Sequence, residues 1–526
     1  MSTTPAMPHD DRGPAADEKL DKRIMNIAWV VVLGSIMAIL DMTVVNVAIN
    51  KLSSDFESPL STIQWIVTGY MLALATVIPL TGWASHRFGT KRLYIGSIVL
   101  FVAGSALAGA AWSAESLIFF RVLQGIGGGM IMPAGMTILT QAAGPRRVGR
   151  VMGIISVPML IGPICGPILG GWLVDDISWR WIFFINVPIG AVAIPLAIKI
   201  LERDEPQPGH PLDWKGLAML SPGLAAFVYG LAEMASQGGF NSAKSIVPSV
   251  VGGLLILGFV LHARRDRDSL LDVHLFRERA VGAAAATMSL FSLAFFGAML
   301  LLPLYFQLVR GESALDSGLL LAPQGLGAML MMPVAGILTD KLGPGRIVLV
   351  GLVILLASFV PFTQLSGDTS YWYIGTALFF MGIGMGLTMM PTMTAALQRL
   401  TNEAVPRAST ALNIIQQVAG ALGTAILSVL LANELIARLP KAPAGSEGAT
   451  GGLGAAQGMT DEVRAQLGDT MAGAFGYTFW WALGLLALAV VPALLLPRRP
   501  VEADDHLVDE HGNDSGETVA PPVIMH

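Results

Sequence analysis

The sequence predicts an all-α integral membrane protein, and three observations lead to this fold class. The chain of 526 residues is 53% hydrophobic and 13% charged, with a mean hydropathy of +0.64, whereas a soluble domain usually has about 25% charged residues. Fourteen segments are apolar over the roughly 20 residues that a helix needs to cross a bilayer. Motifs from the first half of the chain recur in the second half, which indicates a duplicated bundle.

The predicted spans fall into two groups of six with an inserted pair between them. The first six form an N-terminal bundle at 24–201: 24–49, 62–83, 93–112, 115–139, 150–173 and 179–201. A Pro-rich linker and two spans, 214–235 and 243–263, make up the segment 202–279. The last six form a C-terminal bundle at 280–496: 280–306, 315–338, 346–366, 370–397, 407–432 and 472–496. Polar tails at 1–23 and 497–526 flank the spans, and the first has no apolar core of a secretory signal.

Lys and Arg predict the orientation of the spans. With the N-terminus inside the cell, the inside segments hold 22 of these residues and the outside segments hold five. Because Lys and Arg concentrate on the cytoplasmic side of membrane proteins, this asymmetry places both tails in the cytoplasm.

The duplication is clearest at two motifs. Gly82–Arg92 (GWASHRFGTKR) matches Gly336–Arg346 (GILTDKLGPGR), 254 residues later. Gly125–Met132 (GIGGGMIM) matches Gly382–Met389 (GIGMGLTM), 257 residues later. Nearly equal offsets between spans of the same predicted direction imply two parallel six-helix bundles, the architecture of rocker-type secondary transporters.

Asp41 and Arg121 are the two ionisable residues that stand out inside predicted spans. Counting from the outer span ends at 1.5 Å per residue, both lie roughly 9–12 Å below the outer surface. Charges at hydrocarbon depth are rare and functional as a rule. One interpretation is a proton site, because burial raises the pKa of a carboxylic acid and a nearby guanidinium lowers it. The other is a static ion pair that joins two helices.

The fifth predicted span combines regularly spaced glycines with prolines: Gly162, Pro163, Gly166, Pro167, Gly170 and Gly171. Glycines every four residues make a flat helix face, and prolines bend the helix. The pattern fits either tight packing or a gating contact between the two bundles.

Three groups of residues are candidates for lining a substrate cavity. Met385 and Met389 belong to a methionine stripe, and methionine adapts to varied apolar shapes. Phe291 and Phe295 are aromatic candidates in the ninth span, and for both groups plain packing is the alternative. The polar side chains of the thirteenth span, Asn413, Gln416 and Gln417, would be costly against lipid and favour a cavity.

Missing motifs exclude several classes. The chain has no Walker nucleotide-binding motif, no H-E-x-x-H and no G-x-S-x-G, so an ATPase and the common hydrolases are excluded. Its single cysteine, Cys165, cannot form an intramolecular disulfide or a cysteine metal cluster. We expect no enzyme activity, no metal, no cofactor and no nucleic-acid partner.

Several motifs together resemble the fourteen-span drug:proton antiporters of the major facilitator superfamily, the group that includes the multidrug resistance protein B exporters. The resemblance covers about 24–496, and its motifs are 40–48 (LDMTVVNVA), 64–70 (QWIVTGY), 79–83 (PLTGW), 121–125 (RVLQG), 162–171 (GPICGPILGG) and 178–190 (SWRWIFFINVPIG). One departure is His86, which stands where the superfamily has a loop acid, whereas the second half keeps Asp340 there.

The resemblance implies the major facilitator fold with 14 transmembrane helices and proton-driven export of amphipathic compounds from a bacterial plasma (inner) membrane. It implies a coupling role for Asp41 and Arg121 and a gating role for Gly162–Gly171. We expect Arg87, Gly89, Asp340 and Gly343 to act in the conformational loops, and Tyr70 and Gln124 to line the cavity.

The partners that we expect from this resemblance are amphipathic small molecules or lipids and the surrounding membrane lipids. A periplasmic adaptor is a further candidate, and we expect a monomer to be the functional unit. The alternative function is export of endogenous lipid or cell-envelope metabolites by the same fold. A membrane enzyme or receptor is disfavoured by the missing catalytic motifs and the duplicated halves.

Overall fold

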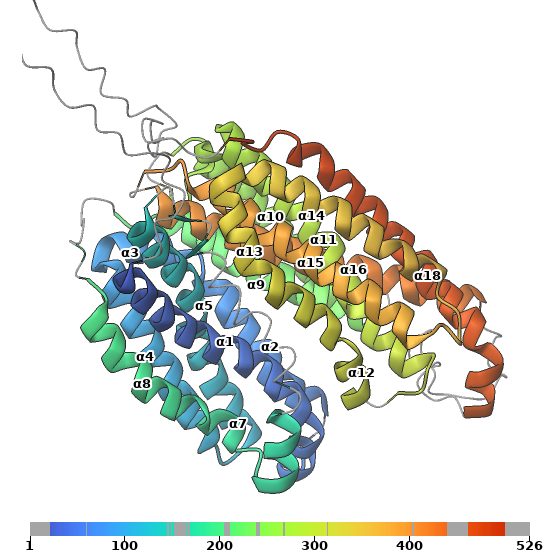
Figure 1. Cartoon of the computed structure of the whole chain (residues 1–526). Helices are drawn as coiled ribbons and strands as arrows, with labels where there is room; N and C mark the ends of the chain where they lie inside the picture. Colours follow the sequence, from blue (N-terminus) through green and yellow to red (C-terminus); the bar gives the residue numbers. More distant parts are fainter. Residues whose placement is uncertain are drawn as a thin grey trace, which may run out of the picture.

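The computed structural model describes residues 21–499 apart from 59, 145–146, 149, 152–165, 167–168, 203, 205–210, 238–241, 267–268, 313, 402–403 and 439–460. The regular elements of this part of the chain are helices, which confirms the predicted all-α class (Figure 1). The first half contains α1 (Lys22–Asp55), α2 (Leu60–Val77), α3 (Leu80–Phe88), α4 (Thr90–Gly109), α5 (Ala114–Ala143), η2 (Leu173–Ile177), α7 (Trp181–Phe184) and α8 (Asn186–Ile200).

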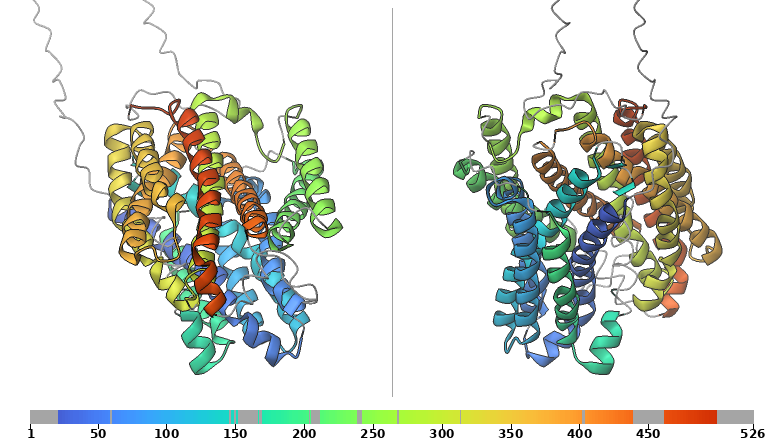
Figure 2. Two further views of the ribbon diagram at one scale, coloured as in Figure 1. Left: turned by 90° about the vertical axis from the view of Figure 1, so that its right-hand side faces the viewer. Right: turned by 60° about the vertical axis from the view of Figure 1, so that its left-hand side comes forward.

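The inserted segment contains α9 (Trp214–Gln237), α10 (Ala243–Ala263) and η3 (Val273–Arg277). The second half contains α11 (Arg279–Leu308), α12 (Ala314–Leu320), α13 (Ala322–Leu342), α14 (Pro344–Phe359), η4 (Val360–Gln364), α15 (Tyr371–Leu397), α16 (Val405–Arg438) and α18 (Asp461–Ala493). The two halves lie side by side, and α9 and α10 stand at one flank (Figure 2).

Twelve helices in the described residues are long and apolar enough to cross a membrane, or 13 if one bent pair counts as a span. The bent pair covers the second predicted span, 62–83, which is broken into two helices. Its two parts, Trp65–Val77 and Leu80–Phe88, meet at an angle of 57°. Pro79 lies at the break, where its ring and missing N–H interrupt the helix. The fifth predicted span, 150–173, falls largely outside the described residues, so the count of fourteen stays a prediction.

The duplicated motifs adopt matching structures. Gly89 and Gly343 end α3 and α13 with φ of 86° and 87°, a backbone region that glycine enters without strain. A Cβ at Gly125 of α5 would lie 2.6 Å from the carbonyl oxygen of Tyr70, and one at Gly382 of α15 would lie 2.0 Å from that of Gln324. Both halves therefore cross two helices backbone to backbone at equivalent glycines.

The inserted pair packs along the boundary between the halves. Leu220 and Leu224 of α9 share an apolar cluster with Ile78 of the first half and with Ala411 of α16 in the second. The hydroxyl of Ser221 donates to the carbonyl oxygen of Thr76 at 2.6 Å. The insert thus contacts both halves.

We call the end of the molecule that carries Arg87, Arg150, Arg264, Arg399 and Arg498 the basic end. Polar contacts between the halves lie there. Arg150 donates its backbone N–H to Asp340 Oδ2 at 3.2 Å, and its Nε lies 3.6 Å from the same oxygen. The hydroxyls of Thr137 and Ser409 are 3.3 Å apart. The structure therefore holds the two halves together at the basic end.

Candidate functional site

The polar site inside the first half is assembled from four helices. Asp41 lies on α1, Ser105 on α4, Arg121 and Gln124 on α5, and Asn186 at the start of α8. The start of α5 is fixed by a reciprocal cap in which Ser113 and Ser116 each accept a hydrogen bond from the other's backbone N–H. Arg121 follows two turns later. A Cβ at Gly104 would lie 2.8 Å from Gln124 Cα, so this glycine lets α4 approach the site closely.

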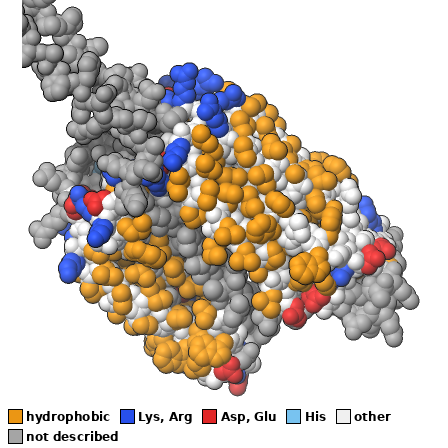
Figure 3. Space-filling view, viewed as in Figure 1, with side chains coloured by type: hydrophobic (Ala, Val, Ile, Leu, Met, Phe, Trp, Pro, Cys, Tyr) orange, Lys and Arg blue, Asp and Glu red, His pale blue; other side chains and the backbone are white. Residues whose placement is uncertain are grey.

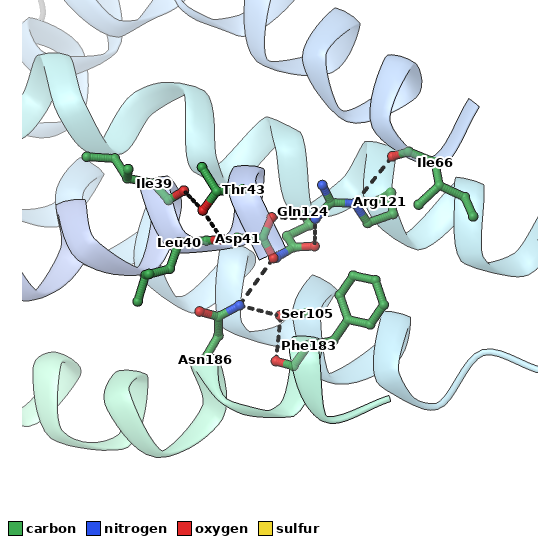
Figure 4. Close-up of polar contacts among 10 residues, drawn as sticks. All are labelled: Ile39, Leu40, Asp41, Thr43, Ile66, Ser105, Arg121, Gln124, Phe183 and Asn186. Atoms are coloured by element: carbon green, nitrogen blue, oxygen red, sulfur yellow. Dashed lines mark hydrogen bonds and ion pairs between the residues drawn. The ribbon is translucent and has the colours of Figure 1, made fainter. Parts of the chain in front are cut away.

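Asp41 and Arg121 form a buried ion pair (Figure 4). Arg121 Nη1 donates to Asp41 Oδ2, and both residues are 1% exposed. From their matching depths we expected the two charges either to pair or to share a water-filled cavity, and in this structure they pair. A pair so far from water attracts strongly, but its desolvation is costly unless further hydrogen bonds satisfy both groups.

Amide side chains supply those further bonds to Asp41. Gln124 Nε2 donates to Asp41 Oδ1 at 2.8 Å, and its Oε1 accepts from Arg121 Nη1 at 2.7 Å. Asn186 Nδ2 donates to Asp41 Oδ1 at 3.2 Å and contacts Ser105 Oγ at 3.0 Å. Asp41 therefore accepts three hydrogen bonds, one from each of Arg121, Gln124 and Asn186.

The guanidinium of Arg121 is enclosed on its other sides. Its Nε donates to the carbonyl oxygen of Ile66 at 3.3 Å, and its carbon lies 4.1 Å from the centre of the Tyr70 ring. A cation over an aromatic face is attracted by the ring quadrupole. Tyr70, which we predicted to line the cavity, is buried beneath Arg121.

The Asn186 amide has an acceptor beside Asp41 that the described part of the chain leaves unused. Asn186 Oδ1 is buried and has no hydrogen-bond partner among the described residues. An amide presents a donor on one side and an acceptor on the other, so rotation of Asn186 would offer an acceptor to a protonated Asp41. Among the residues that the structure describes, no three metal-ligating side chains gather in one place.

Sequence reasoning missed Asn186 and Ser105 as site residues. Asn186 lay within a motif that we matched, but nothing in the sequence indicated that it points at Asp41. Ser105 is one of several small residues in α4, and its contact with Phe183 (hydroxyl to carbonyl oxygen, 2.8 Å) becomes visible only in the packed structure.

Three of the six residues of the predicted gating motif lie outside the described residues, namely Gly162, Pro163 and Pro167. Gly166 is described, and a Cβ there would lie 2.0 Å from Thr43 Oγ1. Thr43 is two residues from Asp41, so the motif approaches α1 next to the ion pair. Gly170 is buried, and a Cβ at Gly171 would meet nothing within 4 Å.

The apolar cavity candidates lie in the packed core of the second half. Phe291 and Phe295 are each 1% exposed and stack on one another at 5.2 Å. Met385 and Met389 are 8% and 2% exposed in the same core cluster. This burial matches the packing alternative, and a role in substrate binding stays a prediction.

The polar candidates lie on α16. Asn413 Nδ2 donates to the carbonyl oxygen of Ser409 at 2.8 Å and contacts Met136 Sδ across the boundary between the halves at 3.5 Å. Gln416 is half-buried and Gln417 is exposed. Asn413 is therefore the member of this group that touches the first half.

The loop candidates lie at the basic end. Gly89 and Gly343 form the equivalent turns described above, and Arg87 is exposed just before the first. Asp340 contacts the first half through Arg150. These positions suit a contact that forms and breaks as the halves move, and that role stays a prediction.

Long apolar helices with a buried ion pair between two of them define a multi-pass membrane protein. The chain matches the Major Facilitator Superfamily model over residues 31–424 and belongs to this family of transporters.

Relatives and solved structures agree with this membership. The chain is 43% identical over 495 residues to the multidrug resistance protein B homolog of Mycobacterium tuberculosis, covering 92% of each chain. It is 32% identical over 416 residues to the multidrug export protein EmrB of Escherichia coli, covering 78% of this chain and 80% of that protein. A double-tryptophan mutant of XylE (TM-score 0.60, 15% identity, 91% of this chain and 97% of that chain) and the human organic anion transporter MFSD10 (TM-score 0.56, 15% identity, 89% and 100%) share the fold.

Proposed function

We propose that the protein is a proton-coupled exporter of amphipathic drugs and other toxic compounds. The observation that carries the proposal is the buried Asp41–Arg121 pair with its amide partners. Relatives named for multidrug resistance and multidrug export support the substrate class. The protein would span a bacterial plasma membrane 14 times with both termini inside, act as a monomer and need no cofactor beyond the proton gradient.

The coupling follows from the charge on Asp41. When Asp41 is ionised, Arg121, Gln124 and Asn186 all donate to it. A proton on this carboxyl removes its attraction to Arg121, so the contact between α1 and α5 weakens. Rotation of the Asn186 amide would then bind the neutral acid. Two arrangements of one site, selected by a proton, are what a transporter needs to couple proton entry to a change of shape.

The contacts between the halves support a direction for the proton movement. With the basic end inside, as the positive-inside rule predicts, the Arg150–Asp340 and Thr137–Ser409 contacts close the inner side. In this state Asp41 would take up a proton from outside, and its release inside would follow the opening of these contacts.

The alternative function is export of endogenous lipid or envelope metabolites. It would use the same site and fold and would differ from drug export in its substrate. Cells that express the protein should extrude ethidium against its gradient, and a proton uncoupler should abolish the extrusion. Extrusion that continues in the presence of the uncoupler would refute proton coupling. No drug effect, together with phospholipid transfer by the purified protein in vesicles, would favour the alternative.

Asp41→Asn tests the site itself. We expect proton-driven efflux to fall at least tenfold, because asparagine cannot carry the exchangeable charge. Binding of ethidium to the purified variant should persist within a few-fold. Glu233→Gln is the matched control, since Glu233 is a carboxylate of α9 outside this network. Equal efflux by Asp41→Asn and wild type, measured across pH 6 to 8, would remove Asp41 from the mechanism.

A further inference from the structure

A cavity of about 590 Å³ lies at the basic end of the second half, apart from the Asp41 site. It is lined by the start of α11 (Glu278, Arg279 and Ala280), by Arg399 after α15, and by the segment Leu494–Arg499 that follows α18. Three separate chain segments therefore meet around it.

The cavity is strongly basic. Four arginines line it, Arg279, Arg399, Arg498 and Arg499, against the single carboxylate of Glu278. That carboxylate already accepts a hydrogen bond from the backbone N–H of Ala280, at the first turn of α11, at 3.5 Å. Arg279, Arg498 and Arg499 are exposed. Four residues that carry guanidinium groups thus line one volume, and Arg498 Nη2 also donates to the carbonyl oxygen of Leu494 at 3.4 Å. Guanidinium is well suited to phosphate because it offers paired N–H donors.

The chain segment that carries two of these arginines is held in place by the backbone. Gly345 at the start of α14 donates its N–H to the carbonyl oxygen of Pro497 at 2.8 Å. A Cβ at Gly343 would lie 2.6 Å from the carbonyl oxygen of Arg498, so a positive-φ glycine makes room for this segment. The backbone of Arg498 is fixed against the turn between α13 and α14.

The cavity also has an apolar side. Leu494 and Leu495 line it and are 47% and 48% exposed. On this half of the molecule the apolar surface begins where Lys and Arg side chains gather (Figure 3). A ligand that fits both features carries an anionic group and an apolar chain.

We propose that this cavity binds the headgroup of an anionic phospholipid such as phosphatidylglycerol. The arginines would hold the phosphate, and the acyl chains would lie along Leu494 and Leu495. Basic pockets between helices at a membrane surface bind anionic headgroups in this way. Free phosphate has the same charged group but would not contact the two leucines, so an anionic phospholipid is the ligand that fits the whole cavity.

The test is a lipid titration of the purified, delipidated full-length protein, followed by native mass spectrometry. Phosphatidylglycerol, phosphatidylcholine and inorganic phosphate are the three probes. We expect wild type to bind phosphatidylglycerol about tenfold or more tightly than phosphatidylcholine. Inorganic phosphate at the same concentration should neither bind nor displace the lipid. Equal binding of the two lipids would overturn the proposal, and so would displacement by phosphate.

Variants locate the site. The triple variant Arg279→Gln, Arg498→Gln and Arg499→Gln should lose the preference for phosphatidylglycerol about tenfold or more. The matched control Lys215→Gln, Arg264→Gln and Arg265→Gln removes three exposed basic residues of the inserted pair at the same end and should keep it. If both lose it equally, the binding is a general charge effect and the proposal is wrong. The lysine variant of the three site positions keeps the charge but lacks the paired N–H donors, so it should fold and show a preference between those of wild type and the glutamine variant. A preference as low as that of the glutamine variant, with intact folding, would contradict a headgroup site.

Discussion

The two halves of the molecule share their backbone packing but differ in charge at one equivalent position. In the first half Arg121 lies four residues before Gly125 and pairs with Asp41. In the second half Leu378 holds the corresponding place before Gly382 and is fully buried in apolar core. Both glycines let their helices cross so closely that an added Cβ would overlap a backbone carbonyl oxygen. The duplication therefore acts as an internal control.

The comparison shows that the fold does not need a charge at this position. A leucine packs there in the second half, whereas the first half maintains a buried guanidinium at considerable desolvation cost. Because leucine can occupy the equivalent position, the buried guanidinium of Arg121 is not required for packing and must serve another purpose. The shared glycine packing therefore serves the fold, whereas the charged network of the first half serves a function. This supports the proposed coupling role of Asp41.

Arg121→Leu, which copies the second half into the first, should have the largest effect on stability. It leaves the carboxylate of Asp41 buried without its cation, so the free energy of unfolding should fall by about 3–5 kcal/mol. Thermal unfolding of the purified variant, followed by tryptophan fluorescence, measures the loss.

A double variant sharpens this prediction. Asp41→Asn combined with Arg121→Leu removes both charges, so part of the lost stability should return and the two changes should not add. Strict additivity would mean that the ion pair contributes no coupling energy and that each residue acts alone.

The sequence predicted the architecture better than the site. Span positions follow from hydropathy. Counting residues placed Asp41 and Arg121 at equal depth, where the two charges could either pair or share a water-filled cavity. The kink at Pro79 was not predicted, because hydropathy gives the length of an apolar segment and not the direction of its helix axis. Asn186 and Ser105 were missed because their role depends on which faces of α8 and α4 turn toward Asp41, and that rotation is set by packing. Burial of Phe291 and Met389 could not be told from cavity lining, since both patterns are apolar.

Alanine at the equivalent glycines tests whether the shared packing is equally important in both halves. Gly125→Ala and Gly382→Ala should each lower the free energy of unfolding by about 1–3 kcal/mol, because the new Cβ would overlap a backbone carbonyl of the crossing helix. Gly96→Ala is the control, since a methyl group added at this position of α4 would meet nothing within 4 Å, and alanine favours a helix there by up to about 1 kcal/mol. A large loss in one half only would break the symmetry.

The smallest effect concerns how each half holds its basic-end turn. In the first half the carboxylate of Asp204 accepts from the backbone N–H groups of Thr90 and Lys91 and so caps α4, whereas in the second half the backbone of Pro497 does this for α14. Asp204→Ala should therefore lower stability by about 1 kcal/mol, and Asp204→Asn, which keeps one acceptor, by less. Glu202→Ala removes the same charge from an exposed pair with Arg23 and should change little. If Asp204→Ala and Glu202→Ala shift the unfolding temperature equally, the net charge at this end decides stability and the helix cap does not. If only Asp204→Ala shifts it, a side chain restrains the turn before α4, whereas the main chain restrains the turn before α14.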